Sequence, residues 1–387
     1  MVDLSLTDEH MALRDTVAQF ARHEVAPVIG DLYERHAFPY DLVRAMGRMG
    51  LFGLPFPEDV GGMGGDFFGL GLALEELARV DSSVAITLEA AVCLGAMPIH
   101  RFGSPAQRER WLPELTSGQK LGAFGLTEPG GGTDTASPRT RGRRDESGWV
   151  LDGSKAFITN SGTDITAFVT VTAETGRRED GRAEISAFIV PTGTPGFTVG
   201  PPYSKVGWNS SDTHEVSLDG VRVDVDSLVG EQGRGHAQFL AILDEGRVAL
   251  AALATGLAQG CVDESVAYAT ERSAFGRPIG ANQGLAFQIA DMEAAVHVAR
   301  LAWYDAAWRA VSGLPFSRQA AVAKLVASEA AVANARTAAQ VFGGYGFMND
   351  YPVGRFYRDA KILEIGEGTS EVQRMIIARS LGLPLGR

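Results

Sequence analysis

The sequence predicts an α+β protein of three domains. They are an N-terminal α-helical domain (residues 1–120), a central antiparallel β-sandwich or barrel domain (121–231) and a C-terminal four-helix-bundle domain (232–387). Three observations predict this organisation. The chain has 387 residues, more than a single apolar core usually serves. Apolar residues recur at helical spacing in both end regions, and short β-rich runs separated by turn residues lie between them.

The N-terminal region is expected to be helical. Thr7 begins a helix in which Leu13, Val17 and Phe20 recur at intervals of three and four residues, as on the buried face of a surface helix. Further helices are expected at about 41–49, 68–80, 82–102 and 105–117. The glycine cluster at 61–65 is interpreted as a connecting loop.

The central region is predicted to be a small β domain. Its runs are rich in β-branched and aromatic residues and lie at 149–151, 156–159, 167–171, 187–190, 197–199 and 215–218. Exposed hairpin tips are expected at 145–148 and 175–181.

Longer helices are predicted after about residue 230, at 236–272, 282–312 and 317–342, and a closing pair follows them. The alanine-rich run 320–339 allows helices to approach closely and is typical of a bundle interior. In the closing pair, Phe356, Ala360 and Leu363 share one helical stripe that we expect to be buried.

A glycine-flanked carboxylate joins the two closing helices. The helical pattern breaks at Gly366 and Gly368, and Ser370 with Gln373 forms a capping box that starts the second helix. Glu367 therefore lies on a short link where a carboxylate can reach a bound ligand as a base. A solvated turn is the alternative, and it is the commoner interpretation of an isolated G-E-G.

Composition excludes several classes of protein. A net charge of −12 argues against general nucleic-acid binding, although an anionic cofactor remains possible. Cys93 and Cys261 predict neither a disulfide framework nor a metal site. The acidic stretch 1–9 does not resemble a signal peptide, and the apolar run 248–260 is too short to span a bilayer. We therefore expect a cytoplasmic protein without membrane insertion.

Two segments could bind a flat or charged ligand. The first is the glycine-rich loop A-F-G-L-T-E-P-G-G-G-T-D at 123–134, where Thr127 and Thr133 provide hydroxyl groups. The second is the strand end F-I-T-N at 157–160. A plain loop and a plain strand end are the alternatives, and neither a dinucleotide G-x-G-x-x-G nor a P-loop occurs in the sequence.

Together with E-R-S-A-F-G-R-P-I, Q-V-F-G-G-Y-G-F and Y-R-D-A-K-I-L-E-I-G-E-G-T-S-E-V-Q-R, these segments resemble the acyl-CoA dehydrogenase family, in its usual motif order and over nearly the whole chain. The resemblance implies an FAD site, partly shared with a neighbouring subunit, formed by Phe124, Leu126, Thr127, Gly132, Thr133, Phe157, Ile158, Thr159, Arg272, Phe275, Gln283, Gln340, Gly343, Gly344, Thr369 and Glu371. It implies acyl-CoA contacts from Thr133, Asp244, Arg247 and Gly368. It also implies an electron-transfer flavoprotein as acceptor and a homotetramer arranged as a dimer of dimers.

Glu367 matches the catalytic base of the family. It would remove the proton α to the thioester while the β hydrogen leaves as hydride to flavin N5, giving a trans-2-enoyl-CoA. A minority of relatives place the base at the position of Gly246, which cannot serve. Three residues depart from the usual pattern: Phe157 where Trp is common, Thr133 where Ser is commoner, and Asn209 where Arg is frequent.

Other functions remain open at this stage. An acyl-carrier-protein-linked dehydrogenase would use the same flavin and base. A flavin oxidase or monooxygenase of this fold is disfavoured by Glu367, and a catalytically silent scaffold would bind no FAD. The arginines of 139–144 are interpreted as a solvated hairpin, with contact to CoA phosphates as the functional alternative. The sequence favours a short or medium acyl group, with a branched chain as one alternative.

Overall fold

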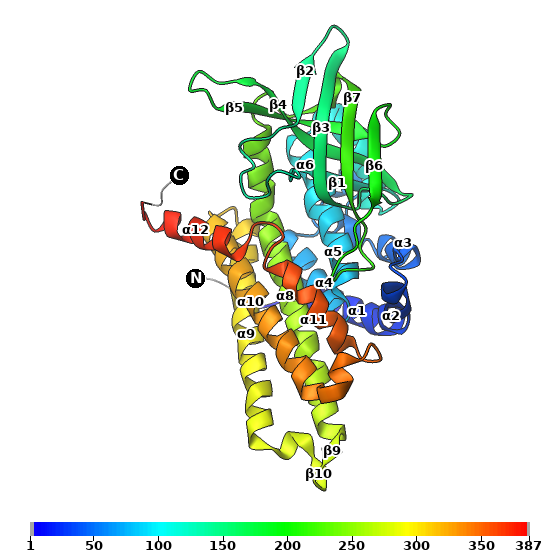
Figure 1. Ribbon diagram of the computed structural model, residues 1–387, viewed down its shortest axis with the longest axis vertical. Coiled ribbons are helices and arrows are strands. Elements are labelled where there is room, and N and C mark those ends of the chain that lie inside the picture. Colours follow the sequence, from blue (N-terminus) through cyan, green and yellow to red (C-terminus); the bar gives the residue numbers. More distant parts are fainter. Residues whose placement is uncertain (1–3, 385–387) are drawn as a thin grey trace.

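The computed structural model describes residues 4–384, so residues 1–3 of the acidic N-terminal stretch lie outside the described part. The predicted α+β organisation is confirmed. Helical regions precede and follow a strand-rich domain, which lies at one end of the molecule with the helices extending away from it (Figure 1).

The N-terminal helices include those predicted at about 41–49, 68–80, 82–102 and 105–117, with ends shifted by at most two residues, and also the helix Ala26–Glu34, which was not predicted. They are α1 (Asp8–Phe20), the π-helical turn η1 (Ala21–Val25), α2 (Ala26–Glu34), α3 (Tyr40–Arg48), α4 (Phe67–Ala78), α5 (Ser82–Glu89), the π-helical turn η4 (Ala90–Ala96), α6 (Met97–Phe102) and α7 (Pro105–Thr116), with short 3₁₀ turns η2 (Leu51–Gly53) and η3 (Glu58–Val60). Thr7 caps α1 by accepting a hydrogen bond from the His10 amide. The segment Ser82–Phe102 is long and apolar enough to cross a membrane, but 94% of its apolar window is buried inside the protein, as in a core helix.

The β domain is one mixed sheet. Its strands are β1 (Leu121–Gly125), β2 (Arg141–Arg144), β3 (Gly148–Thr159), β4 (Thr166–Arg177), β5 (Ala183–Pro191), β6 (Phe197–Pro202), β7 (Thr213–Asp224) and β8 (Leu228–Val229), which follows the 3₁₀ turn η5 (Val225–Ser227). The strand order is β6-β7-β3-β2-β4-β5-β8, with β1 also paired to β4. Most pairs are antiparallel, as predicted, but β1 and β2 run parallel to β4. Both strands share one edge of β4, and the glycine-rich loop lies between them in the sequence.

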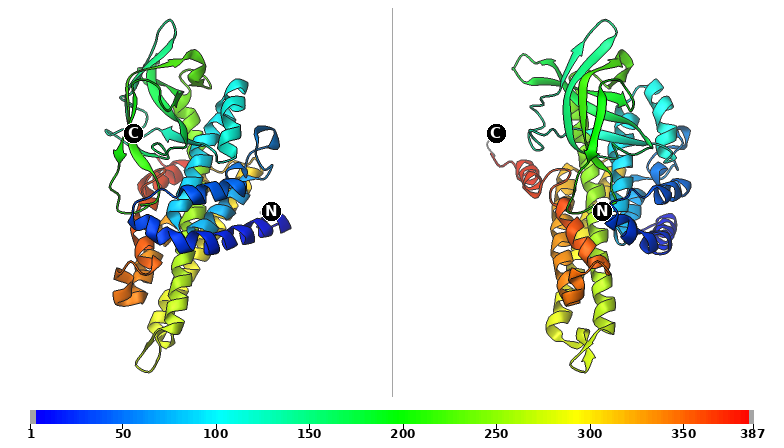
Figure 2. Two further views of the ribbon diagram at one scale, coloured as in Figure 1. Left: turned by 90° about the vertical axis from the view of Figure 1, so that its right-hand side faces the viewer. Right: turned by 45° about the vertical axis from the view of Figure 1, so that its right-hand side comes forward.

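The C-terminal helices form the predicted bundle around one very long helix. Its elements are α8 (Gly235–Glu271), the small hairpin β9 (Ser273–Ala274) and β10 (Arg277–Pro278), η6 (Ile279–Ala281), α9 (Gln283–Val311), α10 (Ser317–Phe342), η7 (Gly343–Phe347), α11 (Pro352–Leu363) and α12 (Ser370–Ser380). Helix α8 runs from the β domain to the β9–β10 hairpin at the opposite end (Figure 1). The N-terminal helices lie on one side of α8, and helices α9 and α10 lie on its other side (Figure 2).

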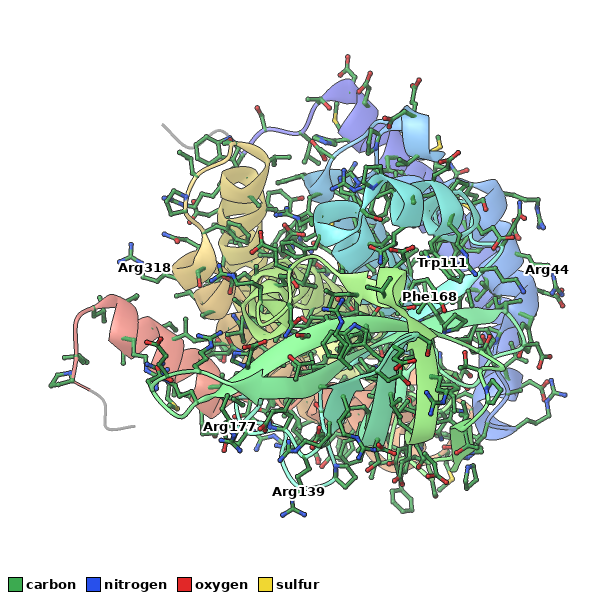
Figure 3. All side chains as sticks on the ribbon, turned by 90° about the horizontal axis from the view of Figure 1, so that it is seen from above. Arg44, Trp111, Arg139, Phe168, Arg177 and Arg318 are labelled. Carbon is green, nitrogen blue, oxygen red and sulfur yellow. The ribbon has the colours of Figure 1, made fainter. Side chains whose placement is uncertain are left out.

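The helical regions share one hydrophobic core, whereas the interior of the sheet forms a second core. On one side, Trp111 of α7 packs edge-on against Phe168 of β4, with ring centroids 4.9 Å apart (Figure 3). On another side, buried Asp359 of α11 accepts hydrogen bonds from Tyr33 Oη (2.6 Å), Ser82 Oγ (2.8 Å) and the Trp208 amide (2.7 Å). One carboxylate thus joins the N-terminal helices, the β domain and the last helical pair.

Candidate active site

The link between α11 and α12 has the geometry that its glycines allow. Glu367 has φ of +53° and Gly368 of +94°, both in the left-handed region that a non-glycine residue such as Glu367 rarely adopts. The preceding stripe, Phe356, Ala360 and Leu363, is buried as predicted. The link therefore starts from a firmly packed helix.

The predicted capping box is wrong by one residue. Thr369, with an extended backbone, is the N-cap of α12, and its Oγ1 accepts a hydrogen bond from the Val372 amide (3.3 Å). Ser370 is already helical, and its amide donates to the Glu364 carbonyl (3.0 Å). The two patterns cannot be separated by sequence, because threonine and serine cap helices about equally well.

Three side chains hold the backbone of the link. Gln373 Nε2 donates to the carbonyls of Glu367 (3.3 Å) and Gly368 (2.8 Å). Arg247 Nε of α8 donates to the Glu367 carbonyl (3.5 Å), and Lys324 Nζ of α10 donates to the Gly368 carbonyl (2.8 Å). The sequence analysis did not assign Lys324 or Gln373 to the site.

The Glu367 carboxyl group is buried, and neither oxygen has a hydrogen-bond partner among the described residues. It lies against Gly246 of α8, where an added Cβ would be 2.7 Å from Glu367 Cδ. Burial raises the pKa of Glu367, while the neighbouring Glu89 carboxyl group and the charges of Arg247 and Lys324 act in the opposite direction. The group is therefore set up as a base stronger than an exposed carboxylate.

A second buried carboxyl group, Glu89 of α5, faces Glu367. Its side chain is fully buried, and burial together with the Glu367 charge raises its pKa well above the ordinary value. Two neighbouring carboxyl groups in a dry site resist ionising together, which favours the protonated form of Glu89. The Cys93 thiol lies beside the pair, and burial raises its pKa as well. A lone acidic residue in the apolar run 82–102 was the sequence signal for Glu89, and the sequence analysis missed it.

The two segments predicted to flank a flat ligand lie together. The Ala156 amide donates to the Thr127 carbonyl (2.9 Å). Beneath them, buried Lys155 Nζ donates to Glu128 Oε1 (2.7 Å), and Glu128 also accepts from the Thr140 hydroxyl (2.7 Å). This buried ion pair fixes the glycine-rich loop to β3.

Phe157 presents an open aromatic face at the end of β3. Its ring is 65% exposed, its φ is +62°, and its ring centroid lies 5.2 Å from that of Tyr203. Ile158, in contrast, is buried in the core of the sheet, so only its backbone can touch a ligand. Phe124 stacks on Phe239 of α8, with ring centroids 3.9 Å apart.

The other predicted residues occupy different surroundings. Thr133 and Gly132 are exposed, and Thr127, Thr159 and Leu126 are half-buried. Asp244 pairs with Arg247 one turn further along α8. Thr369 and Glu371 lie at the start of α12 with Gly368 before them, where helix amides attract negative charge.

Six predicted cofactor residues lie at the far end of the bundle or close to it. Arg272, Gly343 and Gly344 line a cavity of about 620 Å³ together with Tyr268, Phe342 and Tyr345. The Arg272 guanidinium lies 5.7 Å from the centre of the Tyr345 ring, and Phe275 is fully exposed. Gln283 and Gln340 are exposed nearby on α9 and α10. Within one chain, the β9–β10 hairpin that carries Phe275 lies at the end opposite the β domain (Figure 1).

Comparison with known proteins gives three family matches along the chain. The N-terminal, middle and C-terminal domain models of acyl-CoA dehydrogenase match residues 7–119, 123–221 and 233–382. The chain belongs to the acyl-CoA dehydrogenase family. Members of this family are FAD-dependent oxidoreductases, and the predicted resemblance is confirmed.

Three relatives illustrate the similarity. The chain is 44% identical to a probable acyl-CoA dehydrogenase, YngJ, of Bacillus subtilis over 98% of this chain and 100% of that protein. It superposes with a TM-score of 0.94 and 40% identity on butyryl-CoA dehydrogenase from Megasphaera elsdenii, covering 98% of this chain and 99% of the other. The same values hold for a chain from a structural study of the electron transferring flavoprotein of Acidaminococcus fermentans.

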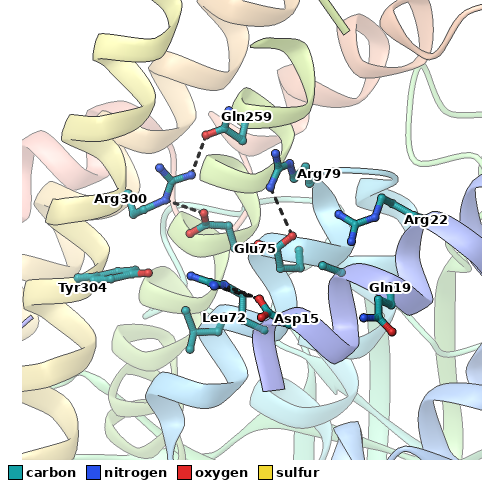
Figure 4. Close-up of a pocket in the computed structure, with 12 residues that line it drawn as sticks. Asp15, Gln19, Arg22, Leu72, Glu75, Arg79, Gln259, Arg300 and Tyr304 are labelled. Carbon is teal, nitrogen blue, oxygen red and sulfur yellow. Dashed lines mark hydrogen bonds and ion pairs between the residues drawn. The ribbon is translucent and has the colours of Figure 1, made fainter. Parts of the chain in front are cut away.

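A second cavity of this acyl-CoA dehydrogenase contains none of the predicted site residues. It has a volume of about 580 Å³ and is lined mainly by charged side chains of α1, α4, α8 and α9. Arg300 there donates to Glu75 (2.7 Å) and Gln259 (2.9 Å) (Figure 4). Among residues 4–384, no group of three His, Cys, Asp or Glu side chains is arranged to hold a metal ion.

Proposed function

We propose that this chain dehydrogenates a short- or medium-chain acyl-CoA to the trans-2-enoyl-CoA, with Glu367 as catalytic base. The observation that carries the proposal is the Glu367 carboxyl group: it is buried, has no hydrogen-bond partner among the described residues and lies on a link whose carbonyls are held by three side chains. A positioned base of raised pKa is what removal of a weakly acidic α-proton needs.

Glu367 acts in its ionised form and receives the proton from the α-carbon of the thioester. The neighbouring Glu89 carboxyl group and the charges of Arg247 and Lys324 favour the ionised form of Glu367 despite its burial. The Glu367 backbone N–H is placed by the same link and would donate to the thioester oxygen as negative charge develops there. The β hydrogen would leave as hydride, for which bound FAD would supply the acceptor.

The residues available around Phe157 fit a flavin ring. An exposed aromatic face offers stacking, the Thr159 and Thr127 hydroxyls offer hydrogen bonds, and the exposed Gly130 and Gly132 leave room for close approach. Thr133 would contact both cofactor and substrate, and Asp244 and Arg247 would lie at the entrance for acyl-CoA. Thr369 and Glu371 would contact FAD at the start of α12.

We further propose that Arg272, Phe275, Gln283, Gln340, Gly343 and Gly344 bind the FAD of a neighbouring subunit in a homotetramer. Their position at the far end of the bundle supports their assignment to the FAD of a neighbouring subunit. The complete exposure of the Phe275 ring also supports it, because exposing a large apolar side chain to water is unfavourable unless another subunit or ligand covers it. The domains would be 1–120, 121–231 and 232–387, since the helix-to-strand changes fall at Leu121 and Gly235.

The name of the Megasphaera relative, butyryl-CoA dehydrogenase, supports a short acyl substrate. The flavoprotein study of Acidaminococcus, in which a similar chain occurs, supports an electron-transfer flavoprotein as acceptor.

Anaerobic titration of the FAD-loaded protein tests the proposal. Butyryl-, octanoyl- and isovaleryl-CoA are added in turn while the flavin absorbance near 450 nm is followed. Bleaching by at least one of them, with enoyl-CoA recovered, is expected. Failure to retain FAD would refute the proposal. If a butyryl group on an acyl carrier protein bleaches the flavin and no CoA ester does, the carrier of the substrate is the acyl carrier protein and not CoA.

A further inference from the structure

Lys324 is a buried cation without a carboxylate partner. It lies on α10, is 1% exposed and belongs to the largest fully buried side chains of the described residues. No carboxylate oxygen of residues 4–384 lies within 4 Å of its Nζ, whose hydrogen bond goes to the Gly368 carbonyl (2.8 Å). Burying an ammonium group is unfavourable unless other interactions compensate for the lost hydration, so its location calls for a reason.

The hydrogen bond of Lys324 supports a strained part of the backbone. The Gly368 carbonyl accepts from both Lys324 and Gln373, at 2.8 Å each. These donors come from two helices, and Arg247 of a third helix reaches the neighbouring Glu367 carbonyl. A positive φ at Glu367 is a strained backbone conformation that persists where surrounding contacts over-determine it.

The charges around Lys324 couple it to the base. Burial lowers the pKa of Lys324 to about 8, and the charge of Glu367 opposes that change. Arg247 of α8 also lowers this pKa, whereas Glu364 beyond α11 and Glu371 of α12 raise it. Glu89 of α5 faces Glu367 from the other side. In return, the charge of Lys324 favours the ionised form of Glu367.

We propose that Lys324 is a positioning residue of the active site: its hydrogen bond fixes the Gly368 carbonyl, and so the left-handed Glu367 backbone that directs the base towards Gly246, while its charge keeps that base ionised. The inference rests on the proposed role of Glu367. The hydrogen bond of Lys324 and its positive charge should therefore contribute separately to the rate of flavin reduction.

Three variants separate these contributions. Lys324→Met removes the charge and the donor at similar length, Lys324→Gln removes the charge and keeps a donor, and Lys324→Arg keeps both. Lys361→Met is the matched control, because Lys361 is a 65% exposed lysine of α11 paired with Glu364. For each protein, FAD content, thermal unfolding and the limiting rate of flavin reduction by butyryl-CoA are measured from pH 5.5 to 9.

For Lys324→Met we expect the reduction rate to fall by about 10- to 100-fold, the effect of a base displaced by a fraction of an ångström. The butyryl-CoA concentration for half-maximal rate should change by less than about threefold, since binding and positioning are separate. The acid limb of the pH profile should move up by about one unit, as expected when a nearby positive charge is lost. Lys324→Gln should show the same pH shift with a smaller loss of rate, and Lys324→Arg and Lys361→Met should resemble the wild type.

An unchanged pH profile and rate in Lys324→Met and Lys324→Gln, with wild-type protein active, would overturn the inference. Loss of FAD and of cooperative unfolding in both variants would also overturn it, because Lys324 would then be a purely structural residue. If the wild-type protein itself is not bleached by any acyl-CoA, the proposed function fails instead.

Discussion

The carboxyl group of Glu367 occupies the space above the backbone of Gly246, 121 residues earlier in the chain, so that no side chain fits at position 246 without displacing it. An added Cβ would lie 2.7 Å from Glu367 Cδ and 2.8 Å from Oε1, inside ordinary contact distance. A base on α8 at position 246 and a base on the link at position 367 are therefore mutually exclusive in this fold.

The first prediction concerns that contact. Gly246→Ala should displace the Glu367 carboxyl group and reduce the rate of flavin reduction by acyl-CoA at least tenfold, with FAD content retained. Gly30→Ala is the control, because a Cβ there meets only Arg355 Nη1 at 3.9 Å. Equal rates in the two variants would show that Glu367 has room to move aside without loss.

The second prediction concerns the base itself. Glu367→Gln keeps size and shape and should preserve FAD content and thermal stability, while flavin bleaching by acyl-CoA slows by about 10² to 10⁴, the usual contribution of a general base. Stopped-flow absorbance measures the rate. Bleaching at the wild-type rate would move the base to another residue.

The third prediction concerns Glu89. The Glu89 carboxyl group beside Glu367 acts to lower the pKa of the base. Glu89→Leu removes this polar neighbour, so the pKa of Glu367 should rise and the acid limb of the rate profile should shift to higher pH. Glu89→Gln keeps a polar N–H group there and should leave that limb near its wild-type position. A shift of equal size in both variants would contradict the polar interaction and favour a packing effect.

The fourth prediction concerns stability and pH. Burial raises the pKa of Asp359 to about 6 in the folded protein, from 3.8 in the unfolded chain. A carboxyl group whose pKa is higher in the folded protein than in the unfolded chain stabilises the folded protein at any pH below the unfolded pKa. This contribution is lost as the pH rises through the folded pKa of about 6. The contribution of this pKa change to the free energy of unfolding is up to about 3 kcal/mol.

Asp359→Asn cannot ionise and should lack this loss. The stability of the wild type relative to Asp359→Asn should therefore fall between pH 4 and pH 7, as measured by urea unfolding at a series of pH values. A constant difference across that range would show that Asp359 does not change protonation on folding. Asp359→Ala, which leaves the Tyr33, Ser82 and Trp208 donors without their acceptor, should be less stable at every pH, by about 3 kcal/mol.

Much of the fold could be predicted because its signals are local. Helix α10 begins and ends at the predicted residues, and α8 and α9 differ from the predicted helices by one residue at each end. The repeat of apolar residues and the capping residues carry that information within a few turns. The parallel pairing of β1 and β2 with β4 was not predicted, since it depends on which distant strands share an edge rather than on strand composition.

The sequence by itself determined the family, the order of the elements and the place of Glu367 on a glycine-flanked link, because motifs and backbone requirements are written in neighbouring residues. Only the tertiary structure decided what surrounds that carboxylate. Glu89 of α5, Lys324 of α10 and Gly246 of α8 surround it, and no pattern of neighbouring residues brings these three positions together. Burial and charge act through space, so the pKa of the base is set by helices that are far apart in the sequence and adjacent only in the folded chain.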